Sequence, residues 1–134
     1  MTRLLTVITL FFLSIGIYAQ EKQVWACQTV ENTMLMWENS SWRQSGIIPD
    51  NILITINADN TGSAKRSTED YSDNFTCTSP RLGSYYSCLG SALLDHYLFS
   101  PDEGKLGISS LYGAIMTSAE RDSVSAEIFN CTKF

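Results

Sequence analysis

The chain has 134 residues, with 14 acidic and 9 basic side chains and a formal net charge of −5. An acidic chain without a basic stripe argues against nucleic acid and anionic membrane surfaces as partners. The charge suits a cationic protein partner, and solubility alone would also explain it. The length indicates one domain with a real core, in the size range where disulfides add useful stability.

The first residues indicate export. Met1-Thr2-Arg3 precedes an apolar run from Leu4 to Ile17, and the small residue Ala19 follows. This pattern is typical of a secretory signal peptide, because a membrane span needs about 20 apolar residues. We expect cleavage after Ala19, which leaves a single secreted β domain over residues 20–134. That domain is expected in the periplasm or outside the cell, without membrane contact once the signal is removed. A retained anchor is the alternative.

Each of the four cysteines follows an aromatic residue at a spacing of two: Trp25–Cys27, Phe75–Cys77, Tyr86–Cys88 and Phe129–Cys131. Alternate residues of a strand share a face. The spacing therefore predicts four strands whose buried face carries both a ring and a sulfur. Lipid attachment at Cys27 fits less well, because it would leave an odd number of thiols.

An even number of cysteines in an exported chain predicts a disulfide framework, and four cysteines allow three pairings. We favour Cys77–Cys88, which flank a turn containing Pro80 and Gly83. The partner bridge, Cys27–Cys131, would join the first strand to the last, as in a closed barrel. A zinc site is the rival use of the thiols, but its usual Cys-x-x-Cys spacing is missing from the sequence. We predict an all-β fold, a small antiparallel β-barrel or sandwich stapled by two disulfides.

Further strands are separated by turn residues. They are expected near Met34–Trp37, Ile52–Ile56, Gly62–Arg66, His96–Phe99 and Leu106–Tyr112. The β-branched run Ile52–Ile56 predicts a strand that is buried throughout. In the last strand Val124, Ala126 and Ile128 alternate with Ser125 and Glu127.

No catalytic residue is expected from the sequence. A weak hydrolase would combine Asp95, His96 and a serine, but neighbouring strand residues point to opposite faces. We therefore expect His96 on the outer face of a strand. The segment Asn57–Gly62 resembles the start of a calcium loop, although Thr68 occupies the position of its bidentate glutamate. A hairpin turn explains the same residues, so no metal or cofactor is expected.

Two segments are candidate binding sites. Trp37 and Trp42 flank a turn, and a predicted loop carries Glu69, Asp70, Tyr71 and Asp73. Rigid aromatic side chains dominate interface hot spots, and nearby acids would steer a cationic partner. The alternative is that both tryptophans belong to the core and the acids only aid solubility.

The early Trp25–Cys27 unit, the Trp37–Trp42 pair, the central Cys77–Cys88 hairpin and the final Glu127–Lys133 segment together support a resemblance. In these features the chain resembles small bacterial periplasmic proteins with two disulfides. More distantly it is similar to periplasmic lysozyme-inhibitor barrels. No site residue is carried over from either group.

Export, stapling, small size and acidity predict a non-enzymatic binding protein. Such a protein would be an inhibitor or immunity-type protein of a secreted or cell-wall enzyme, with a cationic protein as its partner. A carrier that binds a small ligand inside a β-barrel is the first alternative. A weak hydrolase is the second.

Overall fold

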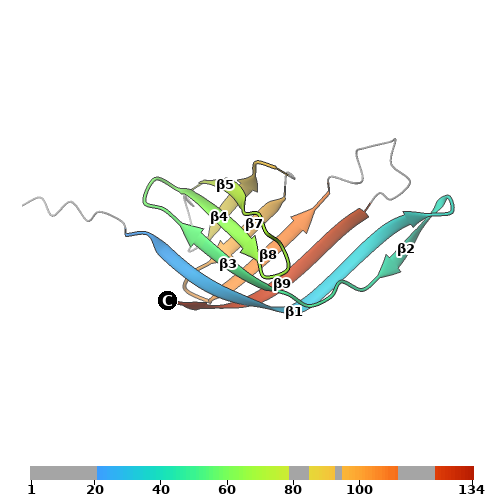
Figure 1. Ribbon diagram of the computed structural model, residues 1–134, viewed down its shortest axis with the longest axis horizontal. Helices are drawn as coiled ribbons and strands as arrows, with labels where there is room; N and C mark the ends of the chain where they lie inside the picture. Colours follow the sequence, from blue (N-terminus) through green and yellow to red (C-terminus); the bar gives the residue numbers. More distant parts are fainter. Residues whose placement is uncertain (1–20, 79–84, 93–94, 112–122) are drawn as a thin grey trace, which may run out of the picture.

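The computed structural model describes residues 21–78, 85–92, 95–111 and 123–134. The predicted signal peptide Met1–Ala19 and the turn at residues 79–84 lie outside these ranges. Within them we find no helix, and so none that could cross a membrane. The strands are β1 (Gln23–Glu38), β2 (Ser41–Ser45), β3 (Asn51–Ile56), β4 (Thr61–Arg66), β5 (Asp73–Thr78), β6 (Tyr86–Gly90), β7 (His96–Ser100), β8 (Lys105–Ser110) and β9 (Ser123–Lys133) (Figure 1). The predicted all-β fold is confirmed.

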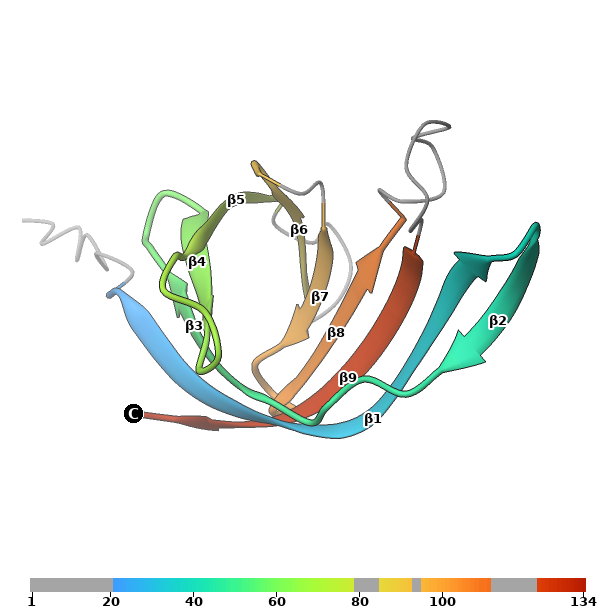
Figure 2. The same cartoon turned by 45° about the vertical axis from the view of Figure 1, so that its right-hand side comes forward.

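Strand β1 closes the sheet into a barrel. Strands β3 to β9 pair antiparallel in chain order, and β1 pairs with β3 on one side and with β9 on the other. The result is an eight-stranded antiparallel barrel whose strands curve around a common interior (Figure 2). Strand β2 pairs with the far end of β1 and forms a hairpin that projects beyond the barrel. Closure removes the exposed sheet edges that invite aggregation.

Strand β3 illustrates how the sequence alternates between the interior and solvent. Ile52, Ile54 and Ile56 are at most 2% exposed, whereas Leu53 is 43% exposed. The prediction that Ile52–Ile56 is buried throughout is therefore wrong. In a closed barrel only one face of each strand meets the core, and the other face meets water.

Aromatic side chains fill much of the barrel interior. The rings of Trp25 and Phe99 meet edge to face with centroids 5.1 Å apart, and those of Phe75 and Tyr97 are also 5.1 Å apart. Phe75 lies opposite Gly62, where an added Cβ would come within 2.3 Å of the ring. The glycine therefore makes room for the aromatic side chain of the neighbouring strand.

Both predicted disulfides are confirmed. They are Cys27–Cys131, with Cα atoms 4.0 Å apart, and Cys77–Cys88, with Cα atoms 3.9 Å apart. Each joins residues that are direct partners on neighbouring strands. The first bridge links β1 to β9 and so closes the barrel covalently. The aromatic residues two positions earlier follow the predicted pattern, being buried at Trp25, Phe75 and Phe129 and half-buried at Tyr86.

A β-bulge shapes the long strand β1. Its pairing with β9 shifts register between Thr29 and Glu31, which leaves Val30 as the extra residue. Bulges bend a strand and increase its twist. Beyond the bulge β1 continues past the barrel to its hairpin with β2 (Figure 1). The apolar segment Met34–Trp37 therefore belongs to β1 and is not a separate strand.

The strand directions define two ends of the barrel. One end carries the turns at residues 57–60 and 101–104, and Trp25, Phe99 and Leu106 are buried near it; we call it the apolar end. The other end carries residues 46–50, residues 67–72 and the start of β7. We call it the acidic end, because its buried side chains include carboxylates.

Candidate functional site

Four carboxylic acids are buried at the acidic end. They are Asp50, Asp73, Asp95 and Glu127, and none is more than 9% exposed. We call these residues the acidic ring. Each one stands two positions before an inward apolar residue, namely Ile52, Phe75, Tyr97 and Phe129. Because β3, β5, β7 and β9 run in the same direction, this repeated pattern places all four carboxyl groups inside the same end of the barrel.

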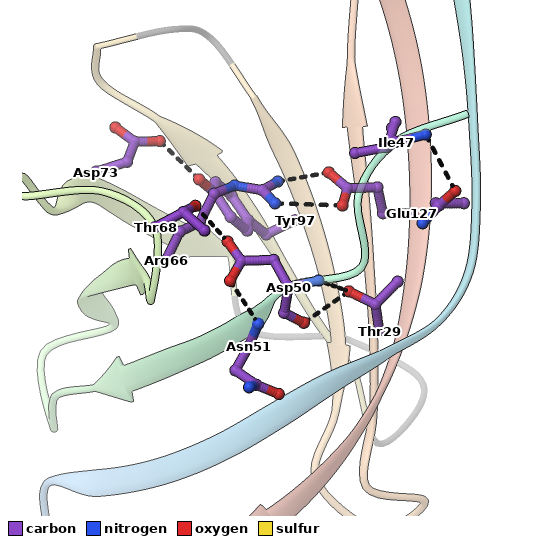
Figure 3. Close-up of polar contacts among 10 residues, drawn as sticks. Thr29, Ile47, Asp50, Asn51, Arg66, Thr68, Asp73, Tyr97 and Glu127 are labelled. Atoms are coloured by element: carbon purple, nitrogen blue, oxygen red, sulfur yellow. Dashed lines mark hydrogen bonds and ion pairs between the residues drawn. The ribbon is translucent and has the colours of Figure 1, made fainter. Parts of the chain in front are cut away.

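Glu127 is neutralised by Arg66, which reaches it from β4 (Figure 3). The guanidinium makes two hydrogen bonds to the carboxylate, at 3.2 and 2.5 Å. Burial by itself would lower the pKa of Arg66, but the bonds and charge of Glu127, with the charges of Glu69 and Asp50, raise it overall. Arg66 therefore stays charged and compensates one member of the acidic ring.

Asp50 is held by donors from the start of the β4–β5 loop. Its carboxylate accepts hydrogen bonds from the hydroxyl of Ser67, the hydroxyl of Thr68 at 2.8 Å and the backbone N–H of Asn51 at 2.6 Å. Burial raises the pKa of Asp50, but these bonds and the charge of Arg66 together lower it. Asp50 is thus an ionised and well-satisfied carboxylate.

Asp73 also has partners for both oxygens. Its Oδ2 accepts a hydrogen bond from the hydroxyl of Tyr97 at 2.8 Å, and its Oδ1 accepts one from the backbone N–H of Ala92 at 3.2 Å. Burial and the charge of Asp73 raise the pKa of Tyr97, so the phenol stays protonated and donates. Gly90 leaves room for this carboxylate, since an added Cβ would lie 2.1 Å from Oδ2.

Asp95 is the least satisfied member of the acidic ring. Its side chain is hydrogen-bonded to Ser110, but its buried Oδ1 has no hydrogen-bond partner within the described part of the chain. Burial raises the pKa of Asp95, and the nearby charge of Asp73 adds to this, although the Ser110 bond opposes it. A buried carboxylate oxygen without a donor carries an uncompensated desolvation cost.

Asp95 lines a small internal hollow at the acidic end. The hollow has a volume of about 20 Å³ and is also lined by Arg66, Asp73 and Tyr97 and by the loop residues Glu69 and Tyr71. That volume accommodates roughly one water-sized group. The hollow therefore joins the buried acids to a loop that reaches solvent.

The two predicted tryptophans lie on the projecting hairpin. Trp37 on β1 and Trp42 on β2 are cross-strand partners, with ring centroids 5.4 Å apart. Between them Asn39 and Ser40 adopt positive φ angles of 49° and 62°, as tight hairpin turns require. Trp42 is 43% exposed, and neither tryptophan belongs to the buried core. The alternative that places both in the core is therefore wrong.

The predicted acidic loop is divided by the structure. Glu69 is half-buried and Asp70 and Tyr71 are exposed in the β4–β5 loop, whereas Asp73 is only 5% exposed. The prediction of Asp73 as a loop acid is wrong, because β5 begins at this residue and turns its side chain inward. The loop lies at the acidic end of the barrel, and the tryptophan hairpin projects beyond the barrel at the far end of β1 (Figures 1 and 2).

An open groove runs along the outside of the barrel next to this loop. It has a volume of about 730 Å³, with Glu69 and Asp70 beside the apolar residues Val30 and Leu53, and Lys65 also contributes to it. The groove crosses strands β1, β3, β4 and β9. It places two of the predicted binding acids at the edge of a concave surface.

His96 lies away from the interior, as predicted. Its ring Nε2 is 2.8 Å from the hydroxyl oxygen of Ser87, whereas Asp95 is buried on the other side of the strand. Asp95 and His96, the two residues that the hydrolase alternative names, thus lie on different faces. The segment Asn57–Gly62, compared above with a calcium loop, contains the turn between β3 and β4.

The sequence reading did not identify the acidic ring. The alternation of Val124, Ala126 and Ile128 favoured an apolar inner face, but Ile128 is 51% exposed and Glu127 is 4% exposed. The spacing of Phe129 and Cys131 contained the correct information, because Glu127 shares their face. Read in the same way, Asp73 shares a face with Phe75 and Cys77.

The chain matches no protein-family model, no curated protein and no solved structure. Its function therefore has to be inferred from the barrel itself.

Proposed function

We propose that this chain is an exported, non-enzymatic binding protein that binds a cationic protein at the acidic end of its barrel. An inhibitor or immunity-type protein of a secreted or cell-wall enzyme fits this description. The observation that carries the proposal is the burial of four carboxylic acids at one end, with Arg66 paired to one of them. Charges in a low-dielectric setting project a field that attracts ions of opposite sign.

Exposed residues at the same end provide contact area. Glu69, Asp70 and Tyr71 extend the negative surface into solvent, and Trp42 adds an exposed aromatic ring on the projecting hairpin. Aromatic residues supply binding energy, while acids of this kind mainly increase the association rate and the choice of partner. The open groove beside Glu69 offers a concave surface to a segment of such a partner.

A carrier function receives less support. The interior is occupied by a cluster of buried side chains, and the internal hollow at the acidic end measures about 20 Å³. Small-molecule sites are usually about 300–1,000 Å³. A hollow of that size is found outside the barrel, in the open groove.

The proposed compartment is supported by the disulfides together with the first residues of the chain. Two disulfides indicate an oxidising environment. Combined with the signal-like segment Met1–Ala19, this supports a periplasmic or secreted location. Cell-wall enzymes and secreted enzymes are available as partners in either place.

A pair of matched variants tests the proposal. The double variant Glu69→Gln/Asp70→Asn removes two negative charges at the acidic end, one from a half-buried and one from an exposed side chain. The double variant Asp102→Asn/Glu103→Gln removes two at the apolar end, in the turn before β8. The oxidised protein and both variants are immobilised and exposed to periplasmic or secreted extract, and binding of each captured protein is then measured at low and high salt.

We expect a cationic protein to bind the wild type in a salt-sensitive manner, because exposed charges are screened within about 10 Å at 0.1 M salt. The variant at the acidic end should bind it more slowly, and the variant at the apolar end should resemble the wild type. Equal loss in both variants would indicate a general charge effect and contradict the proposal, as would capture of neutral or acidic proteins alone.

A further inference from the structure

We propose that the small internal hollow at the acidic end binds a primary ammonium group, with the carboxylate of Asp95 as its main partner. This inference rests on the proposed function, because it names the chemical group through which a cationic partner would enter the barrel. A lysine side chain of a protein and a small free amine both carry such a group.

The unpartnered oxygen of Asp95 is the first observation that points to a ligand. Asp95 is 9% exposed, and its Oδ1 is buried without a donor in the part of the chain that the structure describes. Asp50, Asp73 and Glu127, the other members of the acidic ring, each accept hydrogen bonds from at least two donor groups. Buried polar groups are nearly always hydrogen-bonded, so the free oxygen marks a place where a donor is missing.

The charge around Asp95 indicates that the missing donor is positive. Asp73 lines the same hollow, and Glu69 lies at its edge, whereas Arg66 is already paired with Glu127. Burial and the charge of Asp73 raise the pKa of Asp95 by more than the Ser110 hydrogen bond and the charge of Arg66 lower it, which means that its ionised form is only partly compensated. A cation placed in the hollow would supply that compensation and make the ionised form favourable.

The size of the hollow distinguishes between the common biological cations. About 20 Å³ accommodates one water-sized group. An ammonium group is compact and carries three donors, whereas a guanidinium is a planar fork that is made for two-oxygen recognition. The described residues contain no group of three or more His, Cys, Asp or Glu side chains arranged to hold a metal ion.

The surroundings of the hollow also provide a path from solvent. Tyr71 is 49% exposed and Glu69 is half-buried, and both line the hollow together with Asp95. The four-carbon stem of a lysine is slender and apolar, so it can lie against the Tyr71 ring while the amino group reaches the acids. The exposed loop would thus contact the stem, and the buried carboxylate would contact the charge.

Binding of small probes to the oxidised protein tests the site directly. The probes are Nα-acetyl-lysine methylamide, the corresponding arginine and norleucine amides, and methylammonium chloride. Each is titrated while the side-chain carboxyl carbons are followed by NMR. The variants are Asp95→Asn and, as a matched control, Asp59→Asn, which removes a fully exposed acid at the apolar end.

We expect the lysine amide to shift the Asp95 signal and to bind more tightly than the arginine and norleucine amides. Asp95→Asn should weaken its binding by about 30-fold, because the variant removes one partner of a buried charge pair. Asp59→Asn should stay within about two-fold of the wild type, since distant sites act independently. Binding of methylammonium without the lysine amide would assign the site to small amines, and binding of the lysine amide would assign it to protein side chains.

Equal binding of the lysine and arginine amides would overturn the inference, and so would amine binding that survives Asp95→Asn. Absence of any Asp95-dependent shift at the highest soluble amine concentration would do the same. The proposed function has a separate test in the charge variants at Glu69 and Asp70. If the captured protein binds Asp95→Asn as well as it binds wild type, then that partner does not use the ammonium site, while the binding function stands.

Discussion

The two ends of the barrel are built from the same strands but bury different kinds of side chain. At the apolar end Trp25, Phe99 and Leu106 are at most 8% exposed and belong to the hydrophobic core of aromatic and aliphatic side chains. At the acidic end the buried side chains include four carboxylic acids, which lie beside buried apolar residues such as Ile52 and Ile108. Burying apolar surface stabilises a fold, whereas burying charge carries a desolvation cost even when the charge is paired.

The difference indicates that the apolar end supplies stability, whereas the acidic end serves another purpose. The acidic ring arises from a repeat in which an acid precedes an inward apolar residue by two positions on four strands of the same direction. A barrel that needed only stability would place aliphatic residues there. Buried acids that lower stability are typical of sites kept for another purpose.

The largest expected effect concerns the covalent closure of the barrel. Replacing Cys27 and Cys131 with alanine opens a loop with a sequence separation of 104 residues. The chain-entropy model predicts a loss of about 5 kcal/mol in the free energy of unfolding, against about 3 kcal/mol for the Cys77–Cys88 pair. Urea unfolding of both double variants measures the two losses, and a larger loss for Cys77–Cys88 would contradict the role of Cys27–Cys131 in closing the barrel.

A loss nearly as large is expected at the acidic end when a buried charge loses its partner. Arg66→Met leaves the carboxyl group of Glu127 buried without its ion-pair partner, since the Glu127 side chain is 3% exposed. Breaking a buried ion pair costs about 3–5 kcal/mol. Urea unfolding should show that loss for Arg66→Met and a clear recovery for Arg66→Met/Glu127→Leu. If Arg66→Met is as stable as the wild type, then the Arg66–Glu127 ion pair does not contribute to the free energy of unfolding and the prediction is contradicted.

The sequence was sufficient for the fold but not for the site. The aromatic–cysteine spacing predicted the inner face of four strands, because alternation is a local property. The turn between Cys77 and Cys88 predicted one disulfide, and the position of Cys27 and Cys131 on the first and last strands predicted the other. Asp73 and Glu127 share that spacing, yet polar residues are ordinarily assigned to solvent when only periodicity is considered. Their burial depends on Tyr97 and Arg66, which lie 24 and 61 residues away in the chain. Such partners are visible only after the barrel is closed.

Asp95 differs from Arg66 at the same end of the barrel, because its removal should increase the free energy of unfolding. The folded-state pKa of Asp95 is raised above its ordinary value, so the native state binds a proton more tightly than the unfolded state does. Asp95 therefore costs stability at neutral pH, and the cost disappears as the pH falls through its raised pKa. Asp95→Asn should stabilise the protein by about 0.5–2 kcal/mol at pH 7, as removal of a strained functional group often does.

Thermal unfolding of wild type and Asp95→Asn between pH 4 and pH 8 measures this effect. The gap between the two should be largest at pH 8 and should shrink toward pH 4, as Asp95 becomes protonated in the native state. Asp59→Asn serves as the control, because Asp59 is fully exposed and its pKa is lowered by hydrogen bonds from Thr61. A variant that is less stable than wild type at pH 8 would show that Asp95 supports the fold instead.

The smallest stability effect is expected at the tryptophan hairpin, which projects beyond the acidic end of the closed barrel. Trp42 is 43% exposed and contacts Trp37 edge to face. Trp42→Ala should therefore cost only about 1 kcal/mol, the value of an exposed cross-strand aromatic pair. A core tryptophan would cost about 3–5 kcal/mol.

If the hairpin contacts the partner, the same substitution should weaken binding by about 2 kcal/mol or more, as interface aromatics do. Tyr71→Ala in the β4–β5 loop provides the comparison within the acidic end of the barrel itself. Loss of binding in Tyr71→Ala alone would confine the partner to the acidic loop, and loss in both would extend the contact to the hairpin. Unchanged binding in both variants would exclude these two surfaces from the interface.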